Sequence, residues 1–307
     1  MDRGIISYGE AMVDYIAGDS INSHYEIFIG GTTLNVAIGT SRLGTPVHYL
    51  CKLGKDSVSQ FIKTTLEAEK VKLDFSVESD VKKICGVYVH VNEKGERYFH
   101  SYVNDTPDEQ LLASELNEIA FRNSSIFYFG SVTLSHPIAY ETTKRAIELA
   151  TKHKVLVAFD ANIRIKRWKS EETCRMTIKE ILPSVDILKL TMEELLFLMQ
   201  TPTVDKGIQK LASYHISYIW ITLGEKGALS FYRGKVIHVE GEKVKAVDTT
   251  GAGDAFMSGI LHCIHTQGLP DNEQMLIEYT QYANKLGAMT VTKHGALTAF
   301  HKSNVRH

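Results

Sequence analysis

The chain has 307 residues, of which 44% are hydrophobic and 23% charged, and its formal net charge at pH 7 is −2. This length suits one large α/β domain or one domain with a small appendage. Acidic and basic residues are interspersed, so no basic stripe indicates nucleic-acid binding. No apolar run approaches a membrane span, and the first residues lack a signal-peptide profile. We therefore expect a cytoplasmic protein without nucleic-acid or membrane partners.

Two early segments predict strands without intervening helices. They are AMVDYIAG with YEIFIGG (11–31) and ICGVYVHV-NEKGE-RYFHSYV (84–103), in which NEKGE has the composition of a hairpin turn. We interpret them as a small sheet that stands off the main domain as a lid or an interface. Because an exposed sheet of this kind needs covering, we expect a homodimer formed through it.

The middle and the end of the chain alternate short apolar runs with helical patterns. Strands are predicted at IFYFGS (126–131), VLVAFD (155–160), DILKL (186–190) and YIWITLG (218–224). Helices are predicted after Pro137, around 170–182, near 192–199, and over 251–267 and 272–290. This alternation is typical of a parallel sheet covered by helices on both faces.

The stretch DTTGAGDAF (248–256) combines small residues with acids. At a helix N-terminus, the amides of Gly251, Ala252 and Gly253 would suit a phosphate. Taken alone, the stretch is also explained as a tight turn in which Asp254 is a favourable first-turn charge, worth roughly 0.3–1 kcal/mol. A carboxylate that accepts a hydroxyl proton is worth ~10²–10⁴ in rate. Phosphoryl transfer therefore explains Asp254 better than anion storage does.

DTTGAGDAF resembles the C-terminal signature of the PfkB/ribokinase family of sugar kinases, and GGTTLNVAIGTSRLG (30–44) resembles its N-terminal signature. The resemblance extends from Tyr8 to about Ala296. It implies a ribokinase-like α/β fold, with a central, mostly parallel sheet, helices on both faces and a small β-sheet lid. Residues 1–10, 36–82 and 106–307 would form the nucleotide-binding and catalytic core, and residues 11–35 and 83–105 the lid.

The second signature implies the catalytic group and a cation site. By the resemblance, Asp254 is the base that deprotonates the sugar hydroxyl, and Gly251, Ala252 and Gly253 form the anion hole for the γ-phosphate. Asp248 and the backbone of Thr250 match positions that often hold a monovalent cation such as K⁺.

The first signature implies sugar contacts. Gly30, Gly31 and Asn35 match the sugar-binding face, and Asp14 in GEAMVDYI matches the acid that accepts sugar hydroxyls. The alternatives are a strand-to-helix turn with Asn35 capping the helix, and a solvated acid in an edge strand at Asp14.

Two further positions are implicated in the choice of sugar. Asp160 to Arg164 with Trp168 resembles the D-x-N-x-R…W segment of fructokinases and 2-keto-3-deoxygluconate kinases, in which Arg164 would hold a substrate oxygen or carboxylate. The alternative is an exposed basic loop. Ser101-Tyr102-Val103 stands where fructokinase-like chains carry Phe-Tyr-Arg, so Tyr102 would contact the sugar or pack within the lid.

The ATP site is implied by weaker matches. Thr191 and Glu194 fall where the family carries its N-x-x-E magnesium and phosphate motif, with Thr191 replacing Asn and Glu194 binding Mg²⁺ through water. Glu194 is also explained as an ordinary first-turn acid. TLGEKGA (222–228) resembles the nucleotide loop. The residues expected to bind ATP are Thr191, Glu194, Thr222, Gly224, Gly227, Asn284 and Gly295, although Asn284 also fits the exposed side of a helix.

The resemblance implies ATP-dependent phosphorylation of a sugar primary hydroxyl. FGSVTLS (129–135) and the D-x-N-x-R…W segment both match the fructokinase branch, so D-fructose to fructose 6-phosphate is the expected reaction. A 2-keto-3-deoxygluconate kinase and a riboside or nucleoside kinase are alternatives, although the missing arginine at Val103 argues against a carboxylated substrate. A non-catalytic sugar sensor on the same fold is a further alternative.

Overall fold

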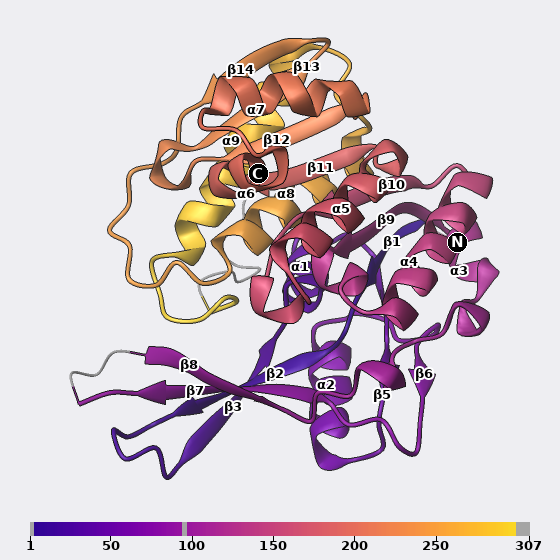
Figure 1. Ribbon diagram of the computed structural model, residues 1–307, viewed down its shortest axis with the longest axis vertical. Helices are drawn as coiled ribbons and strands as arrows, with labels where there is room; N and C mark the ends of the chain where they lie inside the picture. Colours follow the sequence, from indigo (N-terminus) through magenta and orange to yellow (C-terminus); the bar gives the residue numbers. More distant parts are fainter. Residues whose placement is uncertain (1–2, 94–96, 299–307) are drawn as a thin grey trace.

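The computed structural model describes residues 3–93 and 97–298 and is built around one large sheet (Figure 1). This sheet has eight strands in the order β14-β13-β12-β11-β10-β9-β1-β4. The strands are β1 (Gly4–Tyr8), β4 (Val47–Leu50), β9 (Ser124–Gly130), β10 (Leu156–Asp160), β11 (Ile187–Thr191), β12 (Tyr218–Thr222), β13 (Ala228–Tyr232) and β14 (Lys235–Val239). Neighbouring strands from β4 to β12 pair in parallel, and β13 and β14 add an antiparallel hairpin at one edge.

Helices cover both faces of the large sheet, as the sequence predicted. They are α1 (Thr32–Arg42), α2 (Ser57–Ala68), α3 (Glu118–Arg122), α4 (Pro137–Lys152), α5 (Glu171–Ile181), α6 (Met192–Met199), α7 (Val204–Leu211), α8 (Ala252–Gln267) and α9 (Glu273–Thr290). Short 3-10 helices occur at Pro107–Glu109, Ala113–Glu115, Ser131–Leu134, Ile165–Arg167, Leu182–Ser184, Ala212–Tyr214 and Gly224–Lys226. Across the described residues, no helix is long and apolar enough to cross a membrane.

The alternation of side chains within β9 explains why two helical layers are needed. Phe127 and Phe129 join one buried cluster together with residues of α4 to α7. Ile126 and Tyr128 point the other way and join a second cluster with α8 and α9. Successive side chains of a strand face opposite sides, so an apolar run such as IFYF must be covered twice.

A second, four-stranded sheet has the order β3-β2-β7-β8 and projects from the main body in Figure 1. Its strands are β2 (Met12–Ala17), β3 (Tyr25–Gly30), β7 (Cys85–Val91) and β8 (Arg97–Val103). The predicted hairpin turn includes residues 94–96, which lie outside the described residues. β2 and β7 pair in parallel as the inner strands, so the suggestion that Asp14 lies in an edge strand is wrong. A short pair, β5 (Lys52–Leu53) and β6 (Val77–Glu78), stands apart.

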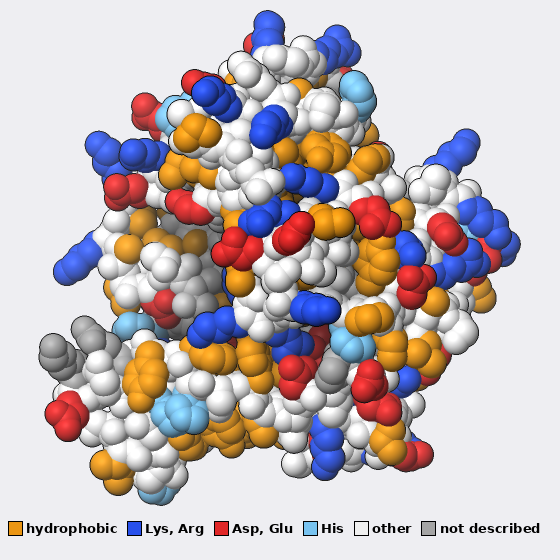
Figure 2. Space-filling view, in the orientation of Figure 1, with side chains coloured by type: hydrophobic (Ala, Val, Ile, Leu, Met, Phe, Trp, Pro, Cys, Tyr) orange, Lys and Arg blue, Asp and Glu red, His pale blue; other side chains and the backbone are white. Residues whose placement is uncertain are grey.

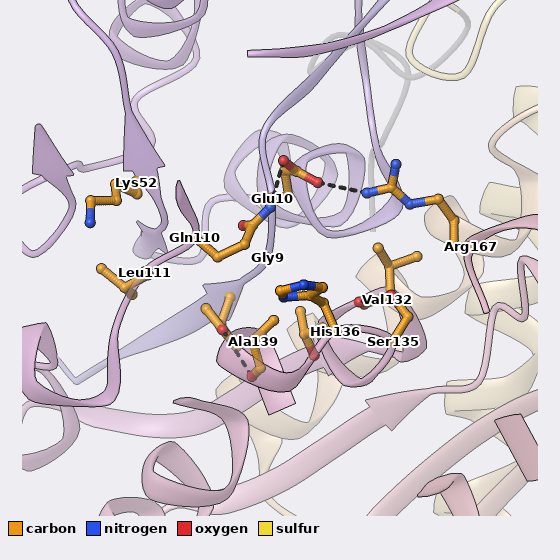
Figure 3. A pocket seen from close by; sticks show the side chains of 12 residues that line it. Gly9, Glu10, Lys52, Gln110, Leu111, Val132, Ser135, His136, Ala139 and Arg167 are labelled. Carbon is orange, nitrogen blue, oxygen red and sulfur yellow. Dashed lines mark hydrogen bonds and ion pairs between the residues drawn. The ribbon is translucent and has the colours of Figure 1, made fainter. Parts of the chain in front are cut away.

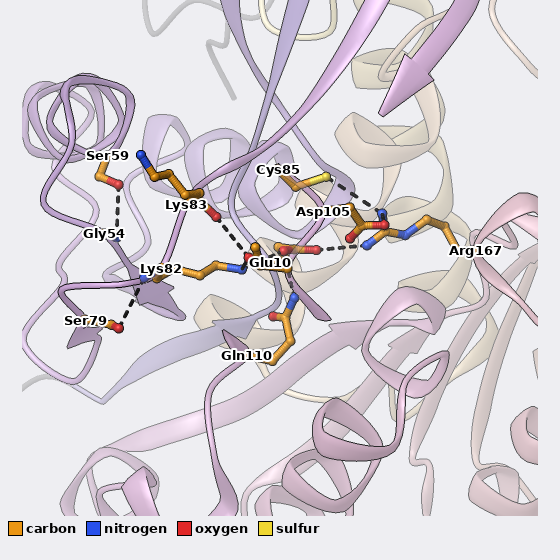
Figure 4. Close-up of polar contacts among 11 residues, drawn as sticks. Glu10, Gly54, Ser59, Ser79, Lys82, Lys83, Cys85, Asp105, Gln110 and Arg167 are labelled. Carbon is orange, nitrogen blue, oxygen red and sulfur yellow. Dashed lines mark hydrogen bonds and ion pairs between the residues drawn. The ribbon is translucent and has the colours of Figure 1, made fainter. Parts of the chain in front are cut away.

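A buried polar cluster joins the small sheet to the main body (Figure 4). The Glu10 carboxylate, between β1 and β2, accepts hydrogen bonds from Lys82 Nζ at 2.9 Å, Gln110 Nε2 at 2.7 Å and Arg167 Nη2 at 3.0 Å. Arg167 also pairs with Asp105, just after β8, at 3.0 Å. The cluster therefore connects one end of the small sheet, where β2 and β7 begin and β8 ends, to the loop after β10.

Candidate active site

The two signature motifs meet at the carboxyl ends of the parallel strands, where α/β proteins place their sites. Asp254 lies in the first turn of α8 and is 8% exposed. Asn35 of α1 donates from Nδ2 to Asp254 Oδ2 at 2.8 Å, across 219 positions of sequence. The Asn35–Asp254 hydrogen bond thus brings the predicted sugar side and the predicted catalytic side into contact.

The environment of Asp254 increases its affinity for a proton. Burial raises the pKa of Asp254, while the hydrogen bond from Asn35 and the charges of Lys189 and Arg164 lower it in part. A general base works best when its pKa is closer to the working pH than that of a solvated carboxyl. The direction of this shift therefore suits a proton acceptor.

The Gly251–Gly253 loop forms the N-terminus of α8. Gly251 is the N-cap residue with φ +80°, and a Cβ added there would lie 2.5 Å from the Cα of Ala296. The Ala252 amide donates to Thr249 O at 3.3 Å. The amides of Gly253 and Asp254 have no acceptor within the helix because of their position in its first turn. They are available to an anion, together with the positive end of the helix dipole.

Asp248 ties the loop before α8 to the loop after α9. Its Oδ1 accepts from the Thr250 amide at 2.9 Å, and its Oδ2 accepts from the Gly295 amide at 2.9 Å. Burial alone would raise the pKa of Asp248, but the hydrogen bonds from Thr250 and Gly295 outweigh it and lower the pKa. Asp248 is therefore held ionised, and Gly295 lies beside the predicted cation position.

Glu194 is held between two loops by its own carboxylate. Thr191 caps α6, and Glu194 completes a capping box: the Thr191 amide donates to Oε2 at 2.8 Å and the Glu194 amide to Thr191 Oγ1 at 3.2 Å. Oε1 accepts from the Ile163 amide at 2.6 Å. Glu194 is thus a first-turn acid that also fixes the loop carrying Arg164.

Two of the predicted nucleotide residues, Gly227 and Asn284, meet at the end of β14. Thr222 ends β12, and Gly224 and Gly227 bound the turn that follows. A Cβ added at Gly227, where φ is +86°, would lie 2.1 Å from Val239 O. Asn284 is 8% exposed and donates to Val239 O at 3.2 Å and to Glu240 O at 3.1 Å. The suggestion that Asn284 faces solvent is therefore wrong: it secures the strand end that Gly227 approaches.

The predicted sugar side is closely packed. A Cβ added at Gly30 would lie 2.8 Å from Asp14 Oδ2. Any residue larger than glycine at position 30 would therefore clash with the Asp14 carboxylate. Burial raises the pKa of Asp14 to about 6. Gly30 and Gly31 do form the turn from β3 into α1, but the N-cap of α1 is Gly31, so the suggestion that Asn35 caps the helix is wrong. The buried Oδ1 of Asn35 has no hydrogen-bond partner among the described residues.

Two adjacent cavities lie on the predicted sugar side, one of them lined by Gly31. Both are lined by Gly9, Glu10, Val132 and Thr133. One is also lined by Gly31, Gly130, Ser131 and Asn162, among other residues. In the other, Glu10, Gln110, His136 and Arg167 surround a common space (Figure 3). The segment FGSVTLS, noted in the sequence for its fructokinase-like character, therefore supplies residues to both cavities.

Tyr102 and Arg164 are placed differently from one another. The register aligns Asp14 with Val87 and Val87 with Tyr102, so Asp14 and Tyr102 share a face of the small sheet. The Arg167 guanidinium lies over the Tyr102 ring at 4.9 Å. Arg164 is exposed, yet its charge acts on Asp254. Sequence reasoning missed Arg167, because nothing in IRIKR indicates which arginine turns inward.

Sequence reasoning also missed a buried ion pair. Lys189 Nζ lies 3.1 Å from both carboxylate oxygens of Asp160, and the two side chains are 2% and 0% exposed. A Cβ added at Gly253 would lie 2.9 Å from this Nζ. The available signal was a lysine inside the apolar run DILKL, since a lysine buried in a strand needs a partner.

A buried carboxylate at the amide-lined N-terminus of a helix, on an α/β fold with a projecting second sheet, is an arrangement that suits a phosphotransferase. The model of the pfkB family carbohydrate kinases matches residues 2–303, and the chain belongs to this family. Members of this family are phosphotransferases that use a hydroxyl group as acceptor.

Known proteins are similar to this chain over nearly its whole length. A probable fructokinase of Arabidopsis thaliana is 33% identical over 96% of this chain and 88% of its own length. A fructokinase of Vibrio alginolyticus is 28% identical over 95% and 94%. The fructokinase of Vibrio cholerae O395, solved with fructose, ADP and calcium, has a TM-score of 0.86 and 28% identity, covering 97% of this chain and 96% of that one. The predicted ribokinase-like fold is confirmed.

Proposed function

We propose that this protein is a fructokinase, which transfers the γ-phosphate of ATP to D-fructose and forms fructose 6-phosphate. The observation that carries the proposal is the buried Asn35–Asp254 contact at the N-terminus of α8. The similarity to curated fructokinases over nearly the full length of the chain supports the choice of sugar.

Asp254 accepts the proton of the sugar hydroxyl as that oxygen attacks the γ-phosphorus. Asn35 orients the carboxylate through Nδ2. The first-turn amides of α8 stabilise charge on the phosphoryl oxygens. General-base help of ~10²–10⁴ in rate corresponds to about 3–5 kcal/mol, so this carboxylate accounts for a large share of the barrier reduction.

The sugar is held by groups from both sheets. Asp14 accepts sugar hydroxyls, Gly30 and Gly31 allow close approach of the backbone, and the unpaired Oδ1 of Asn35 is a further acceptor. Tyr102 and Arg164 close the site from the small sheet and from the loop after β10.

The Arg167 guanidinium on Tyr102 favours a neutral sugar. It pairs with Glu10 at 3.0 Å and with Asp105 at 3.0 Å, so its charge is compensated within the protein. The carboxylate of a substrate such as 2-keto-3-deoxygluconate would have to compete with Glu10 and Asp105 for the Arg167 guanidinium.

The nucleotide and its ions fit the residues on the opposite side. Thr222, Gly224, Gly227, Asn284 and Gly295 would line the adenosine end. Glu194 would bind Mg²⁺ through water, because its oriented carboxylate oxygens each keep a free lone pair. Mg²⁺ would neutralise charge on the ATP phosphates.

A monovalent cation such as K⁺ fits at Asp248, because the hydrogen bonds to this carboxylate keep it ionised. The backbone carbonyl of Thr250 would be a second ligand of the cation. A solved double mutant of the Vibrio cholerae fructokinase contains fructose, ADP and potassium, which supports an ATP- and ion-dependent reaction here.

The small sheet would serve as a lid and as the contact with a second copy of the chain. We retain residues 11–35 and 83–105 as the lid unit in this proposal. The face opposite Asp14 carries Tyr15, Tyr25 and Tyr88, whose rings contact at 5.0 and 4.9 Å. Figure 2 shows apolar and histidine side chains at the surface over this sheet, and Ile27 is 42% exposed. A monomeric mass by light scattering would contradict the dimer.

The four cysteines are buried and free, which supports a reducing compartment and hence the cytoplasm. Cell fractionation tests this location.

A sugar panel with an ADP-release assay tests the substrate. We expect release with D-fructose and little with acid sugars or ribosides. Asp254→Asn should abolish turnover while ATP binding, measured by calorimetry, stays close to that of the parent protein. Turnover near the parent rate in this variant would overturn the assignment of the base, and a protein silent with every sugar would favour a sensor.

A further inference from the structure

The buried Lys189–Asp160 pair lies next to Gly253 of the predicted anion hole. Lys189 is on β11 and Asp160 ends β10, so both belong to the sheet beneath the start of α8. Lys189 Nζ is 3.1 Å from both oxygens of Asp160, and a methyl group at Gly253 would stand 2.9 Å from this nitrogen. The ammonium is therefore close both to the Asp160 carboxylate and to Gly253, a residue of the loop that is to receive phosphate charge.

The geometry leaves Lys189 a donor to spare. An ammonium has three N–H groups, and within the described residues Nζ donates only to the two Asp160 oxygens. At most two N–H groups are used in this way, and Gly253 is close to the same nitrogen. Asp160 thus fixes the position of the ammonium.

Acids surround this lysine from several elements. Burial alone would lower the pKa of Lys189, but Asp160 of β10, Glu194 of α6 and Asp254 of α8 outweigh it and raise the pKa. Lys189 therefore stays charged, and it is a buried cation close to a site that already carries several acids and must also admit phosphate.

Stability alone is a weak reason for such a pair. A buried ion pair pays a large desolvation penalty, and well-packed apolar residues of similar volume often stabilise a protein equally well. A charge retained next to an anion site has a direct electrostatic use, because fixed positive charge in a dry environment stabilises developing negative charge.

We propose that Lys189, held by Asp160 next to Gly253, supports phosphoryl transfer by supplying fixed positive charge to the transferred group. Lys189 is a positioning residue: it keeps its proton while the hydroxyl proton passes to Asp254. The bond from phosphorus to the sugar oxygen forms as the bond to the ADP oxygen breaks. This inference rests on the proposed kinase function.

The test compares variants that differ in the charge of residue 189 alone. Asp160→Asn keeps the ammonium and removes its buried partner, whereas Asp160→Asn with Lys189→Met removes both charges at similar volume. We expect the double variant to lose about 10- to 100-fold in kcat relative to Asp160→Asn, less than the loss of a direct anion-hole donor. The KM for fructose should change little if Lys189 acts on the transferred phosphoryl group, since the proposed sugar contacts are made by other residues.

A second readout does not depend on turnover. ADP with aluminium fluoride and Mg²⁺ imitates the transferring phosphoryl group, whereas ADP with Mg²⁺ alone does not. The double variant should lose most of the extra thermal stabilisation that aluminium fluoride gives Asp160→Asn, while the stabilisation by ADP and Mg²⁺ is retained.

Each outcome decides the inference. Equal kcat and equal aluminium fluoride stabilisation in the two folded variants would overturn it. If the double variant does not fold, Asp160→Asn with Lys189→Gln provides an uncharged hydrogen-bonding pair, and failure of both double variants to fold would assign Lys189 to the fold instead. A parent protein that phosphorylates no sugar would reject the proposed function, whereas a fully active double variant would reject only the role of Lys189.

Discussion

Replacement of Asn35 by leucine tests whether the Asn35–Asp254 contact holds the catalytic base. Leucine has a similar volume but offers no donor, so Asp254 Oδ2 loses the 2.8 Å hydrogen bond within a buried environment. A hydrogen bond to a charged group contributes about 1.5–3 kcal/mol. At a factor of ten for each 1.36 kcal/mol, kcat/KM for fructose should fall about 10- to 150-fold.

The pH dependence of kcat separates this effect from weaker sugar binding. The bond from Asn35 lowers the pKa of Asp254 against the effect of burial, so its loss should raise that pKa further. Since the ionised carboxylate is the active form, activity lost as pH falls should be lost at a higher pH in Asn35→Leu. Sugar binding alone would raise KM and leave the pH profile of kcat in place.

Thr40→Val is the matched control. Thr40 is buried on the same helix, and its hydroxyl has no hydrogen-bond partner among the described residues. We expect activity and pH profile to stay close to those of the parent protein. An unchanged acidic limb in Asn35→Leu, with kcat within about threefold of the parent value, would refute the reasoning.

Three further predictions concern the surroundings of Asp14, Gly251 and Arg167. Because burial raises the pKa of Asp14 to about 6, its carboxylate is lost as pH falls through that value; the KM for fructose should rise below about pH 6, and Asp14→Asn should abolish this dependence. Gly251→Ala should lose most activity, whereas Gly268→Ala, also at positive φ but with nothing within 4 Å of its added Cβ, should only lower the melting temperature through backbone strain of about 1–3 kcal/mol; equal activities in an ADP-release assay would contradict the packing argument. Arg167→Met should reduce the free energy of unfolding by about 1.5–3 kcal/mol in urea, because Glu10 loses one of its three donors and keeps Lys82 and Gln110, while Asp105 loses its partner; Arg145→Met, at an exposed pair, should cost less than about 1 kcal/mol, and equal losses would show that the Glu10 cluster is not structural.

The local pattern of the chain was sufficient for much of the fold. Each predicted apolar run from IFYFGS to YIWITLG forms a strand of the large sheet, and the helices predicted at 251–267 and 272–290 are α8 (Ala252–Gln267) and α9 (Glu273–Thr290). These assignments succeed because a strand covered on both faces must be apolar throughout, and a helix start has its own chemistry. The hairpin β13–β14 at the sheet edge was not predicted, since partly exposed strands lack a continuous apolar run.

Strand order and side-chain direction could not be read locally. The sequence alternative for Asp14 was a solvated acid in an edge strand. In the structure its strand, β2, is an inner strand between β3 and β7. Asn284 fitted the exposed side of a helix, yet it bonds to the end of β14. In each case the deciding neighbour is distant in sequence, and the pattern of one segment carries no information about it.

The sequence by itself determined the class of fold, the position of the anion-binding helix start and the identity of the candidate base, because these depend on local composition and on two specific motifs. Only the tertiary structure decided what surrounds that base. Asn35 contacts Asp254 across 219 positions, and Lys189 reaches Gly253 from beneath the helix. Parallel strands bring their carboxyl ends to one edge of the sheet, so residues from separate crossovers become neighbours only after the strands have paired.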